Sequence, residues 1–244
     1  MHEHREIWLA KLFNDNLPGV GNFTLKILHL PTEPRPWANF MVMELLVMIL
    51  IVVLFAWLRP RLSVDRPGKL QQIFEVIYEF VSGQSNDVVG HGGEKYLPYF
   101  GMLFIFILMS NLIGIIPGFE SPTMAPSVTA GCGIATFFYY NIMGLREHGP
   151  LKYAAHFVGP MWFLAPLIVP IEIISHLARP LSLSVRLYAN MYAGEQVTLV
   201  FLGLTYLVAP AIFMGLHVFV SLLQAYIFML LTMMYVAGAV SHEH

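Results

Sequence analysis

The sequence predicts an all-α polytopic membrane protein with about five membrane helices, the last two forming a long tilted hairpin. The first observation is composition: 57% of the 244 residues are hydrophobic and only 11% are charged. A soluble domain would carry roughly 25% charged residues. The second is that several apolar runs reach the roughly 20 residues that a helix needs to cross about 30 Å of hydrocarbon.

Composition also excludes other classes of protein. The net charge is −2 and no basic patch is present, so we expect no nucleic-acid partner. The single cysteine, Cys132, excludes an intramolecular disulfide and a cysteine-based zinc site. We expect no metal site and no cofactor. Residues 1–19 are polar and mixed in charge, unlike a cleavable signal peptide.

The first predicted membrane helix covers residues 37–58 and ends at Arg59-Pro60-Arg61. Residues 59–95 form a segment that contains an amphipathic helix at 70–82. Its apolar residues recur at helical spacing: Leu70, Ile73, Phe74, Ile77 and Val81. Such a helix lies on the membrane surface, or it packs on another subunit.

Residues 96–145 hold the second and third predicted membrane helices, and residues 161–240 hold a helical hairpin that turns between 203 and 210. Its two helices, about 35 and 30 residues long, would measure about 50 and 45 Å. Because both exceed the bilayer thickness, the hairpin must tilt.

The positions of Lys and Arg predict the orientation, since cytoplasmic loops carry an excess of these residues. The segments after the first and third membrane helices are basic, whereas the segment after the second has neither residue. We therefore expect an external N-terminal tail over residues 1–36, a cytoplasmic segment 59–95 and a cytoplasmic C-terminus.

Arg186 lies near the middle of the first hairpin helix. Burying an ionisable group in a membrane costs from about 2.5 to well over 10 kcal/mol, so such a residue usually has a function. Arginine stays protonated, which makes Arg186 a fixed positive charge and not a proton carrier. Ser182 and Asn190 share its face at four-residue spacing, whereas Glu195 lies on the opposite face.

The second hairpin helix has its own polar row at His217, Ser221 and Gln224. In an antiparallel hairpin, three polar couples share a membrane depth: Arg186 with Gln224, Asn190 with Ser221, and Glu195 with His217. This symmetry indicates an ion path, although incidental core polar residues are the alternative. His217 either protonates near neutral pH or bonds within the helix pair.

Glu172, near the start of the hairpin, has two interpretations that the sequence leaves open. Either it lies at the mouth of an ion channel, or it pairs with Arg179 or His176 on the same helix.

Two stretches, PLSLSVRLYANMYAGE (Pro180–Glu195) and HVFVSLLQAYIFMLLTMMYV (His217–Val236), resemble the a-subunit family of rotary ATP synthases. NLIGIIPG (Asn111–Gly118) and PIEIISHLARPLSLS (Pro170–Ser184) are similar to that family too. The resemblance implies that the chain is no enzyme on its own but the channel subunit of a larger complex. Its partners would be the rotating c-ring, the peripheral-stalk b subunits and the lipid bilayer, in a bacterial inner membrane.

The resemblance also implies roles for single residues. Arg186 would be the essential arginine that faces the c-ring carboxylates, with Asn190 and Gln224 around it. Glu195 and His217 would line the external half-channel. The remaining expected ion-pathway residues are Ser182, Ser221 and, at the cytoplasmic mouth, Glu172. The implied function is translocation of an ion, most simply a proton, through two offset half-channels, which couples the ion gradient to ATP synthesis.

The sequence departs from the family where members often have an acid and an asparagine, in a stretch like ADxN. This chain reads Met124-Ala125-Pro126-Ser127, so Ser127, Glu120 or water must replace those groups.

Two other classes of membrane protein are alternatives to this interpretation. A self-contained ion-coupled secondary transporter would often show paired halves, and no internal symmetry is visible. An intramembrane hydrolase would need a motif such as H-E-x-x-H or G-x-S-x-G, and neither occurs.

Overall fold

The computed structural model describes residues 6–27, 31–64, 66–90, 92–116, 118–156, 165–204 and 208–240. Every regular element within these ranges is a helix. Five helices in the described residues are long and apolar enough to cross a membrane. They are Asn39–Arg61, Leu97–Ile115, Pro126–Pro150, Pro166–Phe201 and Ala211–Val240. The predicted all-α polytopic fold is confirmed, and the chain is an integral membrane protein.

Two short helices precede the membrane region, α1 (Trp8–Asn16) and α2 (Pro18–Ile27). The sequence predicts only a tail for this segment. The buried Asn14 ties it to the start of the membrane region, because its Nδ2 donates to Glu6 Oε1 at 2.7 Å and to the Trp37 carbonyl at 3.1 Å. Asn14 Oδ1 in turn accepts from the Trp37 backbone N–H at 2.9 Å.

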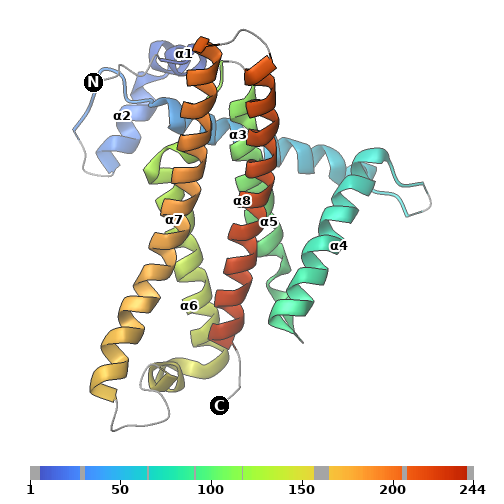
Figure 1. Ribbon diagram of the computed structural model, residues 1–244, viewed down its shortest axis with the longest axis vertical. Coiled ribbons are helices and arrows are strands. Elements are labelled where there is room, and N and C mark those ends of the chain that lie inside the picture. Colours follow the sequence, from blue (N-terminus) through green and yellow to red (C-terminus); the bar gives the residue numbers. More distant parts are fainter. Residues whose placement is uncertain are drawn as a thin grey trace.

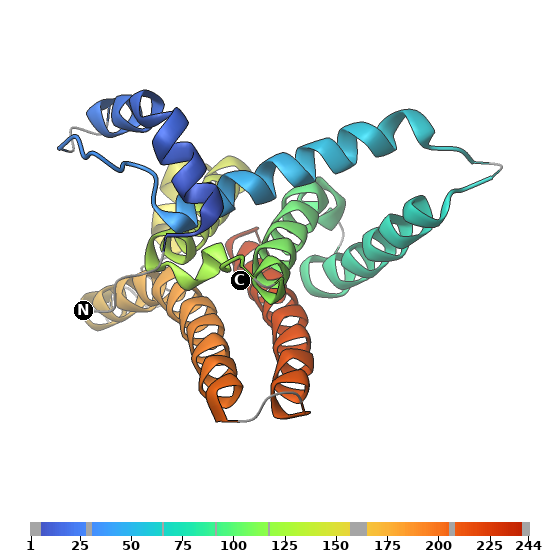
Figure 2. The same cartoon turned by 90° about the horizontal axis from the view of Figure 1, so that it is seen from above.

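The first membrane helix, α3 (Asn39–Leu58), has 20 residues, about 30 Å of helix, which matches the hydrocarbon core. Figures 1 and 2 show α3 running across the long direction of α7 and α8. Side chains such as Val52 and Val53 are exposed in the isolated chain, as expected for a helix surrounded by lipid.

The helix predicted at 70–82 is longer in the structure: α4 spans Lys69–Val89 and ends at Gly90, where φ is 77°. It packs against its own chain. Val81 is buried, the Phe80 and Tyr226 rings lie 5.5 Å apart, and the Tyr226 hydroxyl donates to Gln84 Oε1 at 3.1 Å. Ile73, in the first half of the predicted apolar stripe, remains exposed.

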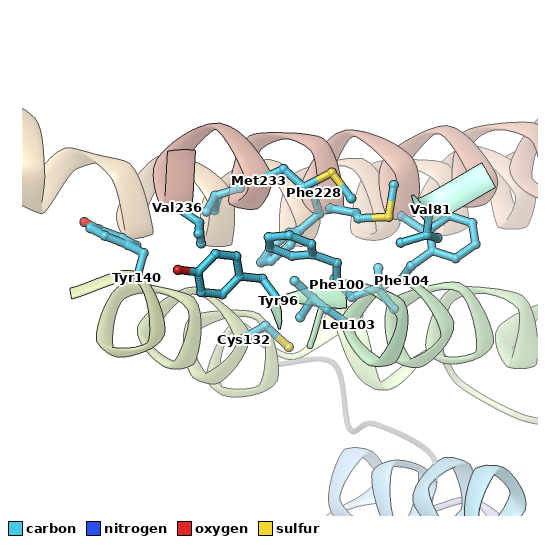
Figure 3. Close-up of a cluster of buried hydrophobic side chains, with 14 of the residues drawn as sticks. Val81, Tyr96, Phe100, Leu103, Phe104, Cys132, Tyr140, Phe228, Met233 and Val236 are labelled. Carbon is cyan, nitrogen blue, oxygen red and sulfur yellow. The ribbon is translucent and has the colours of Figure 1, made fainter. Parts of the chain in front are cut away.

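The core is formed by α5 (Leu97–Leu112), α6 (Pro126–His156), α7 (Ala165–Leu204) and α8 (Val208–Val240). Figure 3 shows Phe228, Met233 and Val236 on one side of this core, with Phe100 and Leu103 on the other. Because these side chains are large and fully or nearly buried, they hold α8 between its neighbours and so position the polar residues that α8 carries.

The third membrane helix was expected to end near residue 145, but α6 continues to His156 through a kink at Gly149 (φ 77°, ψ 162°). That backbone conformation is almost confined to glycine. Pro150 follows directly, and proline removes a helical hydrogen bond, so the kink has a local cause. The turn after it brings Tyr153 back into the core.

The hairpin helices α7 and α8 have 40 and 33 residues, about 60 and 50 Å. Both are longer than expected. Helix α7 ends at Leu204 and α8 begins at Val208. Residues 205–207, within the stretch where the sequence suggests a turn, lie outside the described residues. Figure 1 shows the two helices side by side, with α3 crossing behind them. Since α3 matches the bilayer thickness and the hairpin exceeds it, the hairpin cannot stand parallel to α3 in the bilayer.

Candidate functional site

Arg186 lies on the outer face of α7, because the opposite face of the same helix is buried. Leu183, Leu187 and Met191 are in the core, whereas the Arg186 side chain is exposed and its Nη2 donates to Ser182 Oγ at 3.5 Å. Neither ion pair found in the described residues involves Arg186.

The surface around this arginine is apolar. Leu181 and Val185 on the same helix are 65% and 53% exposed, and Phe219 and Leu222 on α8 are exposed as well. A cation on an apolar membrane surface is costly unless it meets an opposite charge. Within the part of the chain that the structure describes, the Arg186 guanidinium has the Ser182 hydroxyl as its hydrogen-bond partner and takes part in neither ion pair.

Asn190 and Gln224 join the two hairpin helices, since Asn190 Nδ2 donates to Gln224 Oε1 at 2.7 Å. Counting outward from the hairpin turn, the sequence predicts Gln224 at the membrane depth of Arg186, about one helical turn from Asn190. Side chains lean toward the N-terminus of their own helix, so Gln224 reaches toward the hairpin turn and Asn190 away from it. They meet between the two depths. Ser221, the residue expected opposite Asn190, lies in the same interface, with its Oγ 4.0 Å from Met191 Sδ.

His217 faces a pocket of about 240 Å³ between α7 and α8, which Asn190 and Gly194 also line. Its Nε2 is buried and has no hydrogen-bond partner among the described residues. Gly194 makes room for the ring, since a Cβ at that position would lie 3.0 Å from His217 Nδ1. A buried imidazole nitrogen beside a pocket of this size indicates a place for water.

Glu195, next to Gly194 in the chain, is half-buried and has the carboxylate of Glu120 as an electrostatic neighbour. Glu120 in turn accepts hydrogen bonds from Asn39 Nδ2 at 3.2 and 3.4 Å. Of the two side chains that the sequence offers in place of the family's acid, Glu120 is the one that lies close enough to Glu195 to act on it electrostatically. Ser127 is exposed at the start of α6.

At the other end of α7, Glu172 pairs with Arg179, with Oε1 and Nη2 3.6 Å apart. The Arg179 guanidinium also lies 5.4 Å from the centre of the Tyr235 ring on α8. The sequence suggests two partners for Glu172 on the same helix, and the structure pairs it with Arg179. A pair that is about one third exposed remains accessible to water and ions.

A buried polar cluster beside this pair was missed by the sequence reasoning. Asn141 Nδ2 donates to the Phe137 carbonyl at 2.7 Å, which directs Asn141 Oδ1 toward His176 Nε2 at 2.9 Å. Oδ1 also accepts from the Tyr153 hydroxyl at 2.9 Å. Burial raises the pKa of the Tyr153 phenol, an effect that Arg179 partly opposes, so this hydroxyl stays protonated. The sequence did carry a signal for this cluster, because polar residues stand next to one another inside a predicted membrane helix.

No group of three or more His, Cys, Asp or Glu side chains that could hold a metal ion occurs in the residues that the structure describes.

Fold and site together define a polytopic membrane protein whose hairpin presents one outward-facing arginine and carries a polar row inside. A family model described as ATP synthase A chain matches residues 41–237. The chain is 66% identical over 233 residues to the ATP synthase subunit a of Solibacter usitatus, covering 96% of this chain and 100% of the relative. It is 48% identical to that of Koribacter versatilis, covering 98% of each. The chain belongs to the ATP synthase A chain family.

Proposed function

We propose that this chain translocates protons through the membrane sector of an ATP synthase, using two offset half-channels on either side of Arg186. Membership of the family supports a place in that multisubunit complex. The observation that carries the proposal is the exposed guanidinium of Arg186 on an apolar face, with only Ser182 as a hydrogen-bond partner among the described residues. That arrangement fits a partner surface that presents carboxylates, as the c-ring would.

The external half-channel runs past Glu120 and Glu195 to the pocket beside His217. The carboxyl groups can exchange protons with water. The pocket has room for water, and the imidazole nitrogen of His217, which has no hydrogen-bond partner among the described residues, can bind it. Asn190 lines this pocket and is bonded to Gln224. Ser221 lies in the same interface. The polar row thus leads from the pocket toward Arg186.

A carboxylate of the ring takes up a proton at the end of this path. In the neutral form it can face lipid, whereas the charged form cannot do so at low cost. When the carboxyl group returns to Arg186 from the other side, the adjacent positive charge lowers its pKa and favours proton release. Because arginine stays protonated, the same residue blocks direct passage between the half-channels.

The released proton leaves along Ser182 and the Glu172–Arg179 pair, which lies near the start of α7. The positive-inside rule puts this end in the cytoplasm, with the N-terminal tail outside and the C-terminus inside. In that orientation the peripheral-stalk b subunits and a bacterial inner membrane would surround the chain. A potential of 100 mV supplies about 2.3 kcal/mol per charge, so several protons must pass for each ATP.

The rival interpretation, a self-contained secondary transporter, would provide the counter-charge for Arg186 inside the chain. In the described ranges the chain provides none. Family membership likewise favours a subunit of a complex.

The test is ATP synthesis by the whole complex in vesicles energised by an acid–base jump. We expect Arg186→Ala to abolish coupled synthesis, while Arg146→Ala, which removes an exposed arginine in the second half of α6, leaves it unchanged. Continued synthesis by Arg186→Ala would refute the proposal. Ion uptake by the purified chain without other subunits would favour the transporter.

A further inference from the structure

A second pocket, outside the hairpin, lies where α3, α4 and α5 meet. It has a volume of about 490 Å³ and is lined mainly by apolar side chains, among them Phe55, Phe74, Ile77 and Ile105. Figure 2 shows α3 and α4 projecting together from one side of the helix bundle. The Phe55 and Phe74 rings, 5.1 Å apart, join the two helices along this pocket.

One end of the pocket is basic. Arg59 lines it, and Arg61, Arg66 and Lys69 follow within the next ten residues, all exposed. None of these four takes part in the ion pairs found in the described residues, and the Arg61 guanidinium lies 3.8 Å from the centre of the Trp57 ring.

The pocket also contains one acid. Glu75 lines it and already accepts a hydrogen bond from Gln71 Nε2 at 2.7 Å. Gln71 is itself held in place by the backbone of Ser63. Its Nε2 donates to the Ser63 carbonyl, and its Oε1 accepts from the Ser63 N–H. The four basic residues at or near this end, Arg59, Arg61, Arg66 and Lys69, thus outnumber the one acid that lines the pocket.

We propose that this pocket binds the acyl chain of an anionic phospholipid whose headgroup contacts Arg59. Basic residues just beyond the end of a membrane helix attract anionic headgroups, and an apolar pocket in a bilayer is filled most simply by an acyl chain. The volume agrees with a single small ligand, for which pockets of about 300–1,000 Å³ are usual. A partner helix about 10 Å wide and 30 Å long would need roughly 2,400 Å³. The proposal goes beyond ion translocation and does not depend on it.

The experiment counts phospholipids bound to the whole purified complex by native mass spectrometry, after incubation with phosphatidylglycerol or phosphatidylcholine. Gly101 lines the pocket, and a Cβ there meets no atom within 4 Å. Gly101→Leu therefore fills the pocket without a backbone clash. Gly131→Leu is the matched control, because Gly131 on α6 is equally open and is not a lining residue.

We expect Gly101→Leu to lose one bound phosphatidylglycerol relative to the native complex and to Gly131→Leu. Arg59→Gln should weaken the preference for phosphatidylglycerol over phosphatidylcholine about fivefold, since one cation near the surface contributes about 1 kcal/mol. Unchanged lipid counts in Gly101→Leu would overturn the proposal, as would equal binding of the two lipids by the native complex. Loss of a protein subunit in place of a lipid would assign the pocket to a protein partner. If Gly101→Leu failed to assemble, Arg59→Gln decides, and an unchanged preference refutes the site.

Discussion

Asn190 and Gln224, which are 34 positions apart in the chain, share a hydrogen bond of 2.7 Å that joins the two hairpin helices one turn from Arg186. Gln224 is 2% exposed, whereas Arg186 points away from the core. The bond therefore joins the interior of the hairpin beside a charge that lies on its exposed face.

If this bond aligns the hairpin, its two partners should act as one unit. We expect Asn190→Leu and Gln224→Leu each to lower ATP-driven proton pumping by about 2- to 13-fold, which corresponds to the 0.5–1.5 kcal/mol of a typical hydrogen bond. The double variant should be no worse than the poorer single variant, because coupled residues are not additive. Strictly additive losses would show that the two side chains act separately.

The pocket beside His217 predicts a second effect. In Gly194→Ala the new methyl group lies 3.0 Å from His217 Nδ1, so the ring must shift, and we expect slower proton pumping by the assembled complex. Gly215→Ala on α8 is the control, since a Cβ there meets nothing within 4 Å. Both changes raise helix propensity by a similar amount. Equal pumping by the two variants would exclude a role for this pocket.

Glu120 should matter for access from the outside. We expect Glu120→Gln to slow ATP synthesis driven by external acid, because it removes a proton-exchanging group beside Glu195. Glu33→Gln, which changes an exposed acid of the N-terminal segment, should behave as the native complex does. Measuring synthesis rate against external pH gives the comparison. A larger effect of Ser127→Ala than of Glu120→Gln would assign the replacement to Ser127.

The core predicts an effect on stability. Phe228→Ala removes a ring that is 0% exposed between α8 and α5, and truncating such a ring costs about 3–5 kcal/mol. We expect far less assembled complex in the membrane, measured by its yield after mild detergent extraction. Phe219→Ala, on the lipid or partner side of the same helix, should assemble normally. Similar yields would mean that this core does not limit assembly.

The kink of α6 can be tested in the same way. Gly149 has φ 77° and ψ 162°, a conformation that costs a residue with a side chain about 1–3 kcal/mol. Gly149→Ala should therefore lower the thermal stability of the complex, measured by the temperature at which it dissociates. Gly131→Ala, inside the regular part of α6, should leave it unchanged or raise it slightly. No difference between the two would indicate that the kink can relax.

Much of the fold can be predicted from local patterns in the sequence. The apolar runs predict the five membrane helices, because the bilayer sets a minimum length that few other structures satisfy. The four-residue spacing of Ser182, Arg186 and Asn190 predicts one shared face, because helical periodicity is local. The extension of α6 past residue 145 could not be predicted in this way, since Pro150 signals an end and only the contact of Tyr153 with Asn141 shows why the helix resumes.

The sequence by itself determined the helices, the fixed charge at Arg186 and the polar rows on both hairpin helices, since each of these depends on spacing along one chain. Only the tertiary structure decided that Arg186 lies on the exposed face of α7, that Gln224 bonds Asn190, and that Glu120 is an electrostatic neighbour of Glu195. These relationships depend on how helices rotate and slide against one another. Large side chains such as Phe228 and Met191 set that packing, and their fit cannot be read from the periodicity of any single segment.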